Sequence, residues 1–117
     1  MSARPDDGRS AAGLTPWAVI ALPEELNVQN SARAAAELAG AGQQAATVVG
    51  DMSDTRFCDS SAVAALLRAH KDLAAKGNEL RLVITALPVL RILSITGADQ
   101  VLRIYDSRAA ATDRAPS

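Results

Sequence analysis

Short apolar segments alternate with segments of helical periodicity along most of the chain, and this alternation restricts the possible folds more than any other feature. Such a pattern favours an α/β domain whose strands are joined by right-handed crossovers. The segment at residues 45–50 is continuously apolar, as expected for a central strand that is covered on both faces. The expected strands are residues 17–22, 45–50, 80–84 and 101–105, and the expected helices are residues 31–41, 60–76 and one that Pro88 opens and Gly97 closes.

The segments between these elements are polar and contain the usual terminators. Residues 24–27 are expected to form a turn and residues 51–56 a polar loop, after which Phe57 and Cys58 return briefly to the core. Asn30 is the expected N-cap of the first helix. A short helix is also possible after Ser107.

Length and composition indicate one domain. A chain of 117 residues has room for a single core, and a domain of this size buries about two thirds of the surface it exposes when unfolded. The predicted architecture is a mixed, mostly parallel sheet of about four or five strands with about four helices. We expect this domain at residues 14–110, with disordered arms at residues 1–13 and 111–117, where the sequence lacks periodicity.

Charge and rare residues exclude several classes of function. The net charge is −1 and aromatic residues make up 3% of the chain, which disfavours nucleic-acid binding. One Cys and one His cannot form a four-ligand zinc site, so no metal is expected, and no cofactor motif is present. No apolar run reaches about 18 residues, so we expect no membrane span and a cytoplasmic protein.

The helix at residues 60–76 has the clearest amphipathic pattern. Asp59 is placed to cap it, so Asp59 and Ser60 fall where an apolar segment meets a helix N-terminus, a position that attracts anions. On local sequence alone, a simple capping cluster of Asp59, Ser60 and Ser61 is the favoured interpretation. The apolar stripe of the helix consists of Val63, Leu66, Leu67, His70, Leu73 and Ala74.

Two catalytic interpretations are weaker than a binding function. Asp51 and Asp54 resemble a haloacid-dehalogenase-type phosphatase signature, but that motif needs acids at i and i+2, and here they are at i and i+3. Cys58 and His70 could form a thiol nucleophile and its base. Cys58 lies in an apolar context and His70 follows about three turns along the helix, so a buried structural Cys is favoured. We therefore expect a protein that is not an enzyme.

A wider set of residues resembles the signature of the STAS domain family. The segments at residues 48–53 and 57–61, followed at once by the amphipathic helix, are similar to its central motif, in which an apolar pair and an Asp precede an Asp-Ser-Ser sequence. Residues 25–27 and 93–97 resemble two further segments of the family, and the similarity covers about residues 17–107. As a free-standing domain, the chain is most similar to bacterial anti-sigma factor antagonists.

This resemblance implies a phosphorylation switch. An anti-sigma factor with serine kinase activity would modify Ser60, with Ser61 as the alternative acceptor, and a serine phosphatase would reset it. The unmodified protein, a monomer or weak dimer, would bind the anti-sigma factor and so release a sigma factor. The resemblance gives Asp59 and Asp51 supporting roles and places Asn27, Asn30, Ser61, Ala62 and Val63 in the partner surface. The alternative is a non-catalytic STAS subunit of a lipid-transport complex or a stressosome-like scaffold.

Three positions depart from the family pattern. Ala62 replaces the usual Gly and is expected to project a Cβ near the site. Asn27 replaces the usual Asp, which removes a charge from the expected partner surface. The family's additional N-terminal strand would fall in residues 1–13, which are a poor strand sequence.

Overall fold

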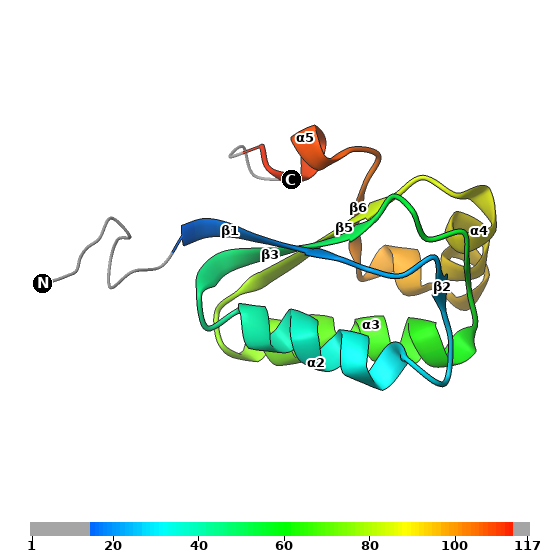
Figure 1. The fold of residues 1–117 in the computed structure, drawn as a ribbon, viewed down its shortest axis with the longest axis horizontal. Helices are drawn as coiled ribbons and strands as arrows, with labels where there is room; N and C mark the ends of the chain where they lie inside the picture. Colours follow the sequence, from blue (N-terminus) through cyan, green and yellow to red (C-terminus); the bar gives the residue numbers. More distant parts are fainter. Residues whose placement is uncertain (1–14, 114–117) are drawn as a thin grey trace, which may run out of the picture.

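The computed structural model describes residues 15–113, which fold around a four-stranded sheet (Figure 1). The strand order is β1-β3-β5-β6, and every neighbouring pair is parallel. Parallel pairing requires a crossover between successive strands, and the intervening helices supply these connections. The strands are β1 (Thr15–Ala21), β3 (Ala45–Met52), β5 (Glu79–Ile84) and β6 (Arg103–Tyr105).

Helices cover the two faces of the sheet unequally. Helices α2 and α3 lie side by side against one face, together with α4 near the end of the sheet, whereas α5 is the only helix of residues 15–113 on the other face (Figure 1). The predicted α/β class, with its mostly parallel sheet and about four helices, is confirmed. The helices are α2 (Ser31–Ala41), α3 (Ser60–Ala75), α4 (Leu87–Thr96) and α5 (Arg108–Ala111), with a 3-10 turn, η2, at Ala98–Gln100.

The main core lies between the sheet and helices α2, α3 and α4. Helix α2 contributes small side chains to it, and the helix packs close to the sheet where Gly50 of β3 faces Leu38. A Cβ added to Gly50 would lie 2.8 Å from Leu82 Cδ2 and 3.3 Å from Leu38 Cδ2, so a larger residue at this central strand position would force these side chains to move. The largest fully buried side chains are Leu26, Leu38, Met52, Leu66, Leu73, Leu80, Leu82, Ile84, Leu93, Val48, Val49 and Val83.

A second, two-stranded parallel sheet lies beside the first and was missed by the sequence analysis. Strand β2 (Glu25–Leu26) pairs with β4 (Phe57–Cys58), so the turn expected at residues 24–27 is wrong. Two-residue strands have no period that a sequence can reveal. Phe57 is 52% exposed and does not enter the core, because the side chains of β4 alternate and its neighbour Cys58 points inward.

The ends of several elements also differ from expectation. Strand β3 continues through Asp51 and Met52, which were expected in a loop, because both residues still pair with β5. The last strand begins at Arg103, since the preceding residues form a turn in which Val101 is exposed. Gly97 ends α4 with a φ of +81°, a conformation that favours glycine, as predicted.

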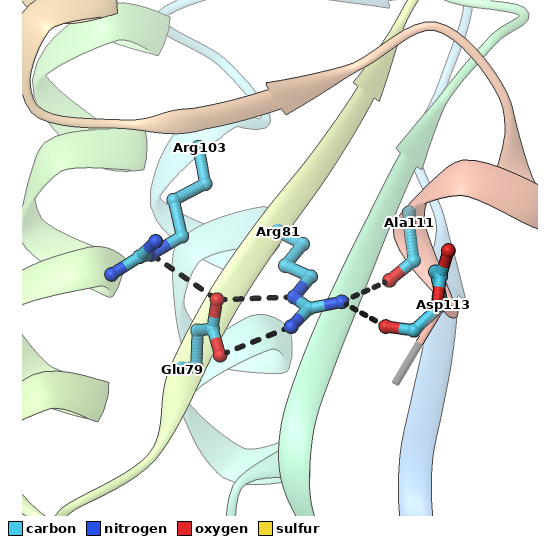
Figure 2. A network of polar contacts seen from close by, with 5 residues as sticks. All are labelled: Glu79, Arg81, Arg103, Ala111 and Asp113. Carbon is cyan, nitrogen blue, oxygen red and sulfur yellow. Dashed lines mark hydrogen bonds and ion pairs between the residues drawn. The ribbon is translucent and has the colours of Figure 1, made fainter. Parts of the chain in front are cut away.

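Helix α5 packs on the second face of the sheet through a small apolar cluster. Ala111 of α5 is buried with Val49 and Val83, and Trp17 and Tyr105 pack against them. The buried Arg81 binds the end of α5 and forms an ion pair with Glu79, as Figure 2 shows.

The predicted domain boundary at residue 110 therefore falls inside α5, and the first residues of the expected tail are part of the fold. The arm expected at residues 1–13 lies outside the described residues, and so does the segment where the family's additional N-terminal strand would fall.

Candidate functional site

The site that the sequence singled out is the junction between β4 and α3. Asp59 has an extended backbone and its Oδ1 accepts a hydrogen bond of 3.0 Å from the Ala62 N–H, so the predicted N-cap is confirmed. Ser60 is the first residue of α3 and is exposed, whereas Ser61 is half-buried. The junction thus presents the Ser60 hydroxyl to solvent beside the positive end of a sixteen-residue helix.

The second oxygen of Asp59 binds a different part of the chain. Asp59 Oδ2 accepts a hydrogen bond of 3.2 Å from the Val28 N–H, in the loop that joins β2 to α2. The Asp59 N–H also donates to the Leu26 carbonyl at 3.2 Å. One residue therefore caps α3 and anchors the loop at residues 27–30 beside Ser60.

Asn27 and Asn30, which were expected to contact a partner, shape this loop from within. Asn27 Oδ1 accepts from the Gln29 N–H at 2.9 Å, and Asn30 Oδ1 accepts from the Asn27 N–H at 2.9 Å. Asn30 Nδ2 also donates to the Glu25 carbonyl at 2.9 Å. Asn30 occupies the N-cap position of α2, but its side chain makes no capping hydrogen bond because these two contacts use it. Local hydrogen bonds of this kind hold a loop in one conformation.

Ala62 and Val63 do not belong to the exposed surface. Ala62 is 0% exposed and Val63 is buried, and both pack in the main core. The Cβ of Ala62 therefore points into the core and does not project beside Ser60 as expected. The side chains of these two residues have no surface to offer a partner, because they lie on the sheet-facing side of α3.

Asp51 lies at the end of β3 and contacts Ser53 and Arg108, not Asp59. Asp51 Oδ1 accepts from the Ser53 N–H at 3.0 Å, and Oδ2 pairs with Arg108 at 2.8 Å. Burial by itself would raise the pKa of Asp51, but the hydrogen bonds from Ser53 and Arg108 and the charge of Arg108 hold this pKa below its ordinary value of 3.8. Asp51 therefore braces the loop that leads to Ser60, and it reaches that site only through the loop.

The two catalytic interpretations find little support in this geometry. The Asp51 carboxylate is buried and paired with Arg108, which leaves it poorly placed to attack a substrate. Cys58 is also buried, and burial, together with the smaller effect of the Asp59 charge, raises the pKa of its thiol above the ordinary value of 9.0. A nucleophilic thiol needs the opposite shift.

Residues 15–113 contain no cluster of three or more His, Cys, Asp or Glu side chains that could hold a metal ion. In the same part of the chain, no helix has the length and apolar character needed to cross a membrane.

Two exposed apolar side chains flank the junction, and the sequence analysis identified neither as exposed. Val28 is 69% exposed on the anchored loop, and Phe57 is 52% exposed two residues before Asp59. Glu25 pairs with Phe57 across the small sheet. No pattern in the sequence marks Val28, because its exposure depends on the loop conformation that Asp59 and the two Asn residues fix.

The sequence and the fold were compared with those of known proteins. The family model of the STAS domain matches residues 10–111. A search of curated proteins finds no match. A Thermotoga maritima protein described as a candidate anti-sigma factor antagonist is 25% identical, with a TM-score of 0.67 over 80% of this chain and 83% of that one.

Three further solved structures share the fold at lower identity. The anti-sigma factor antagonist SpoIIAA, solved in its unphosphorylated form, is 22% identical with a TM-score of 0.69, covering 85% of this chain and 87% of that one. The phosphorylated form of SpoIIAA, a cell fate determinant of Bacillus, is 20% identical with a TM-score of 0.60, covering 80% and 86%. A sulfate transporter family protein from Wolinella succinogenes is 14% identical with a TM-score of 0.68, covering 91% and 92%.

The family model extends from before β1 to the last residue of α5, so it spans both sheets and the junction at Ser60. The order of elements and the Asp59-Ser60-Ser61 junction therefore have one common explanation: the chain belongs to the STAS domain family.

Proposed function

We propose that this chain is a non-catalytic anti-sigma factor antagonist of the cytoplasm, switched by phosphorylation of Ser60. The observation that carries this proposal is the exposed Ser60 hydroxyl on the first residue of α3, beside a carboxylate that fixes the local backbone. SpoIIAA, which shares the fold, is known in an unphosphorylated and a phosphorylated form. Ser61 is the poorer acceptor because it is half-buried.

A phosphate on Ser60 would change the surface more than the fold. It adds nearly two negative charges at the N-terminus of α3, where helix N–H groups and the helix dipole favour an anion. The neighbouring Asp59 carboxylate opposes it, but that carboxylate is already engaged by Ala62 and Val28. The main effect falls on a bound partner, because burying an unpaired dianion in an interface costs several kcal/mol.

The surface around Ser60 suits a protein partner. Val28, whose N–H binds Asp59, and Phe57, two residues before Asp59, provide exposed apolar side chains near the junction. Apolar side chains at the centre of an interface contribute most when a partner excludes water from them. We propose that the anti-sigma factor covers these two side chains together with Ser60, so that a phosphate there prevents contact. Asn27 and Asn30 support this surface by holding the loop rather than by touching the partner.

Labelling with a kinase tests the proposal directly. The purified protein is incubated with an anti-sigma factor kinase and ATP, and the modified residue is mapped by mass spectrometry. Label is expected on Ser60 in the wild type and in Ser61→Ala, and it should be lost in Ser60→Ala. Binding of the kinase, measured by calorimetry, should weaken at least tenfold after modification. Label on Ser61 alone, or unchanged affinity after Ser60 is modified, would refute the proposed switch.

The labelling result, together with co-purification and size-exclusion chromatography, distinguishes this proposal from the alternative STAS functions. The resemblance to a sulfate transporter family protein allows a STAS subunit of a membrane transport assembly. Such a subunit would co-purify with a transporter component and would acquire no label. A scaffold of the stressosome type would instead assemble into large particles, which size-exclusion chromatography detects.

A further inference from the structure

Helix α5 has a small apolar attachment to the sheet. It contains four residues, and the one fully buried residue among them is Ala111, which packs with Val49 and Val83. An alanine side chain is a single methyl group, so its burial contributes little to the free energy that holds the helix down. The attachment must depend on other contacts.

Arginine side chains provide these contacts at both ends of α5. At the C-terminal end, Arg81 donates to the carbonyls of Ala111 and Asp113 at 2.9 and 2.8 Å (Figure 2). Its guanidinium lies over the rings of Trp17 and Tyr105, 5.3 and 5.4 Å from their centroids. A cation is favoured there because the carbonyl end of a helix is negative.

At the N-terminal end, Arg108 forms an ion pair of 2.8 Å with Asp51. The Arg108 side chain is 61% exposed, whereas the Asp51 side chain is 8% exposed. Water can replace the exposed Arg108 contact as α5 lifts, and Arg81, which is buried while α5 is in place, keeps its ion pair with Glu79 and binds water in place of the two carbonyls. A four-residue helix that buries one alanine and is otherwise attached by polar contacts has a low free energy of local opening.

Asp51 also links α5 to the loop before Ser60. Its Oδ2 binds Arg108, whereas its Oδ1 accepts from the Ser53 N–H. The Ser53 carbonyl in turn accepts from Thr85 Oγ1 at 3.2 Å. If Arg108 leaves, a nearly buried carboxylate loses its counter-charge and must turn toward water, which weakens the bond to Ser53.

We propose that α5 is a releasable strap, and that Asp51 couples its release to the loop at residues 53–56. Opening uncovers the apolar face formed by Trp17, Val49, Val83 and Tyr105, while the main core on the opposite face of the sheet stays intact. This inference does not depend on phosphorylation of Ser60.

Native-state hydrogen exchange measured by NMR in increasing urea tests the strap. The amides of Ala111 and Thr112 donate within α5, to Ser107 and Arg108. They should exchange through a local opening with little urea dependence, whereas amides of β3 and β5 should follow global unfolding. If the α5 amides follow global unfolding in the wild type, α5 is an integral part of the fold and the strap is refuted.

Substitution of Arg108 tests the coupling. In Arg108→Gln, the α5 amides should exchange about tenfold faster, as expected for losing a charged hydrogen bond. The Ser53 amide should also exchange several-fold faster, and the fluorescence of Trp17 should shift to the red. Arg68→Gln, which removes an exposed arginine from α3 on the opposite face, should change none of these. If the α5 amides exchange faster in Arg108→Gln but the exchange rate of the Ser53 amide is unchanged, the coupling is overturned. If the exchange rates of the α5 amides are unchanged, the strap is overturned.

Discussion

The double role of Asp59 leads to a prediction that separates its two oxygens. Asp59→Ala removes the cap on the Ala62 N–H and the link to the Val28 N–H together. Loss of an N-cap costs about 1 kcal/mol, within a range of about 0.5–2 kcal/mol. The Val28 contact is long, at 3.2 Å, and exposed, so it adds no more than the lower limit for a hydrogen bond, about 0.5 kcal/mol. The expected loss is therefore about 1–1.5 kcal/mol, or roughly 4–10 °C in Tm for a domain of this size.

Asp59→Asn keeps the cap and removes the charge. Asn and Asp cap helices about equally well, so Oδ1 can still accept from Ala62, while an amide nitrogen facing Val28 cannot accept. Losing the negative charge at a helix N-terminus costs about 0.3–1 kcal/mol. We therefore expect a loss of less than about 1 kcal/mol, together with changed NMR shifts confined to residues 27–30.

Urea unfolding followed by circular dichroism measures both variants. Asp54→Ala is a suitable control, because Asp54 is an exposed acid in the preceding loop. If Asp59→Ala is as stable as the control, the cap does not stabilise α3. If Asp59→Asn is as damaging as Asp59→Ala, the charge rather than the hydrogen bond is what matters, and the reasoning fails.

Three further predictions concern packing, pH and the thiol. Gly50→Ala should destabilise the domain by about 1–3 kcal/mol, because the added methyl group overpacks against Leu82. Gly40→Ala is the control, since its Cβ meets nothing within 4 Å, and it should be neutral or stabilising by up to about 1 kcal/mol. Urea unfolding measures both variants. Because the pKa of Asp51 is lowered in the folded state, the stabilising effect of its charge is complete above pH values near 4 and is lost as the pH falls through the folded pKa. The difference in urea midpoint between the wild type and Asp51→Asn should therefore shrink as the pH falls. A difference that stays constant would contradict a lowered pKa. Cys58 should react with a thiol reagent far more slowly in the folded protein than in urea, since it is buried and its pKa is raised; equal rates would show that β4 is open.

Elements with local signals could be predicted from the sequence. Helix α2 begins and ends at the predicted residues, and α3 ends one residue early. The cap at Asp59 and the glycine at the end of α4 were identified because capping depends on residue types at adjacent positions. The exposed Ser60 followed from the same local reasoning.

Features that depend on distant residues could not be predicted. Arg108 lies fifty-seven positions after Asp51, so no local pattern identifies it as the partner of Asp51, and only the family resemblance implied a role for Asp51 near the site. The burial of Arg81 depends on Glu79 and on the end of α5, which the strand pattern of residues 80–84 does not reveal. The family resemblance places Ala62 in the partner surface, but the orientation of α3 on the sheet turns this residue into the core.

The parallel sheet also determines when the chain can fold. Thr15 pairs with Ala45, Thr47 with Glu79, and Arg81 with Arg103, so each pairing joins residues separated by a whole crossover. Contacts at such separations form slowly, because the connecting segment must be ordered first. During synthesis, β5 has no partner on one side until residues 103–105 have emerged from the ribosome, and α5 can dock only after them. The segment that we propose to be the first to open is therefore also the last of the described elements to emerge.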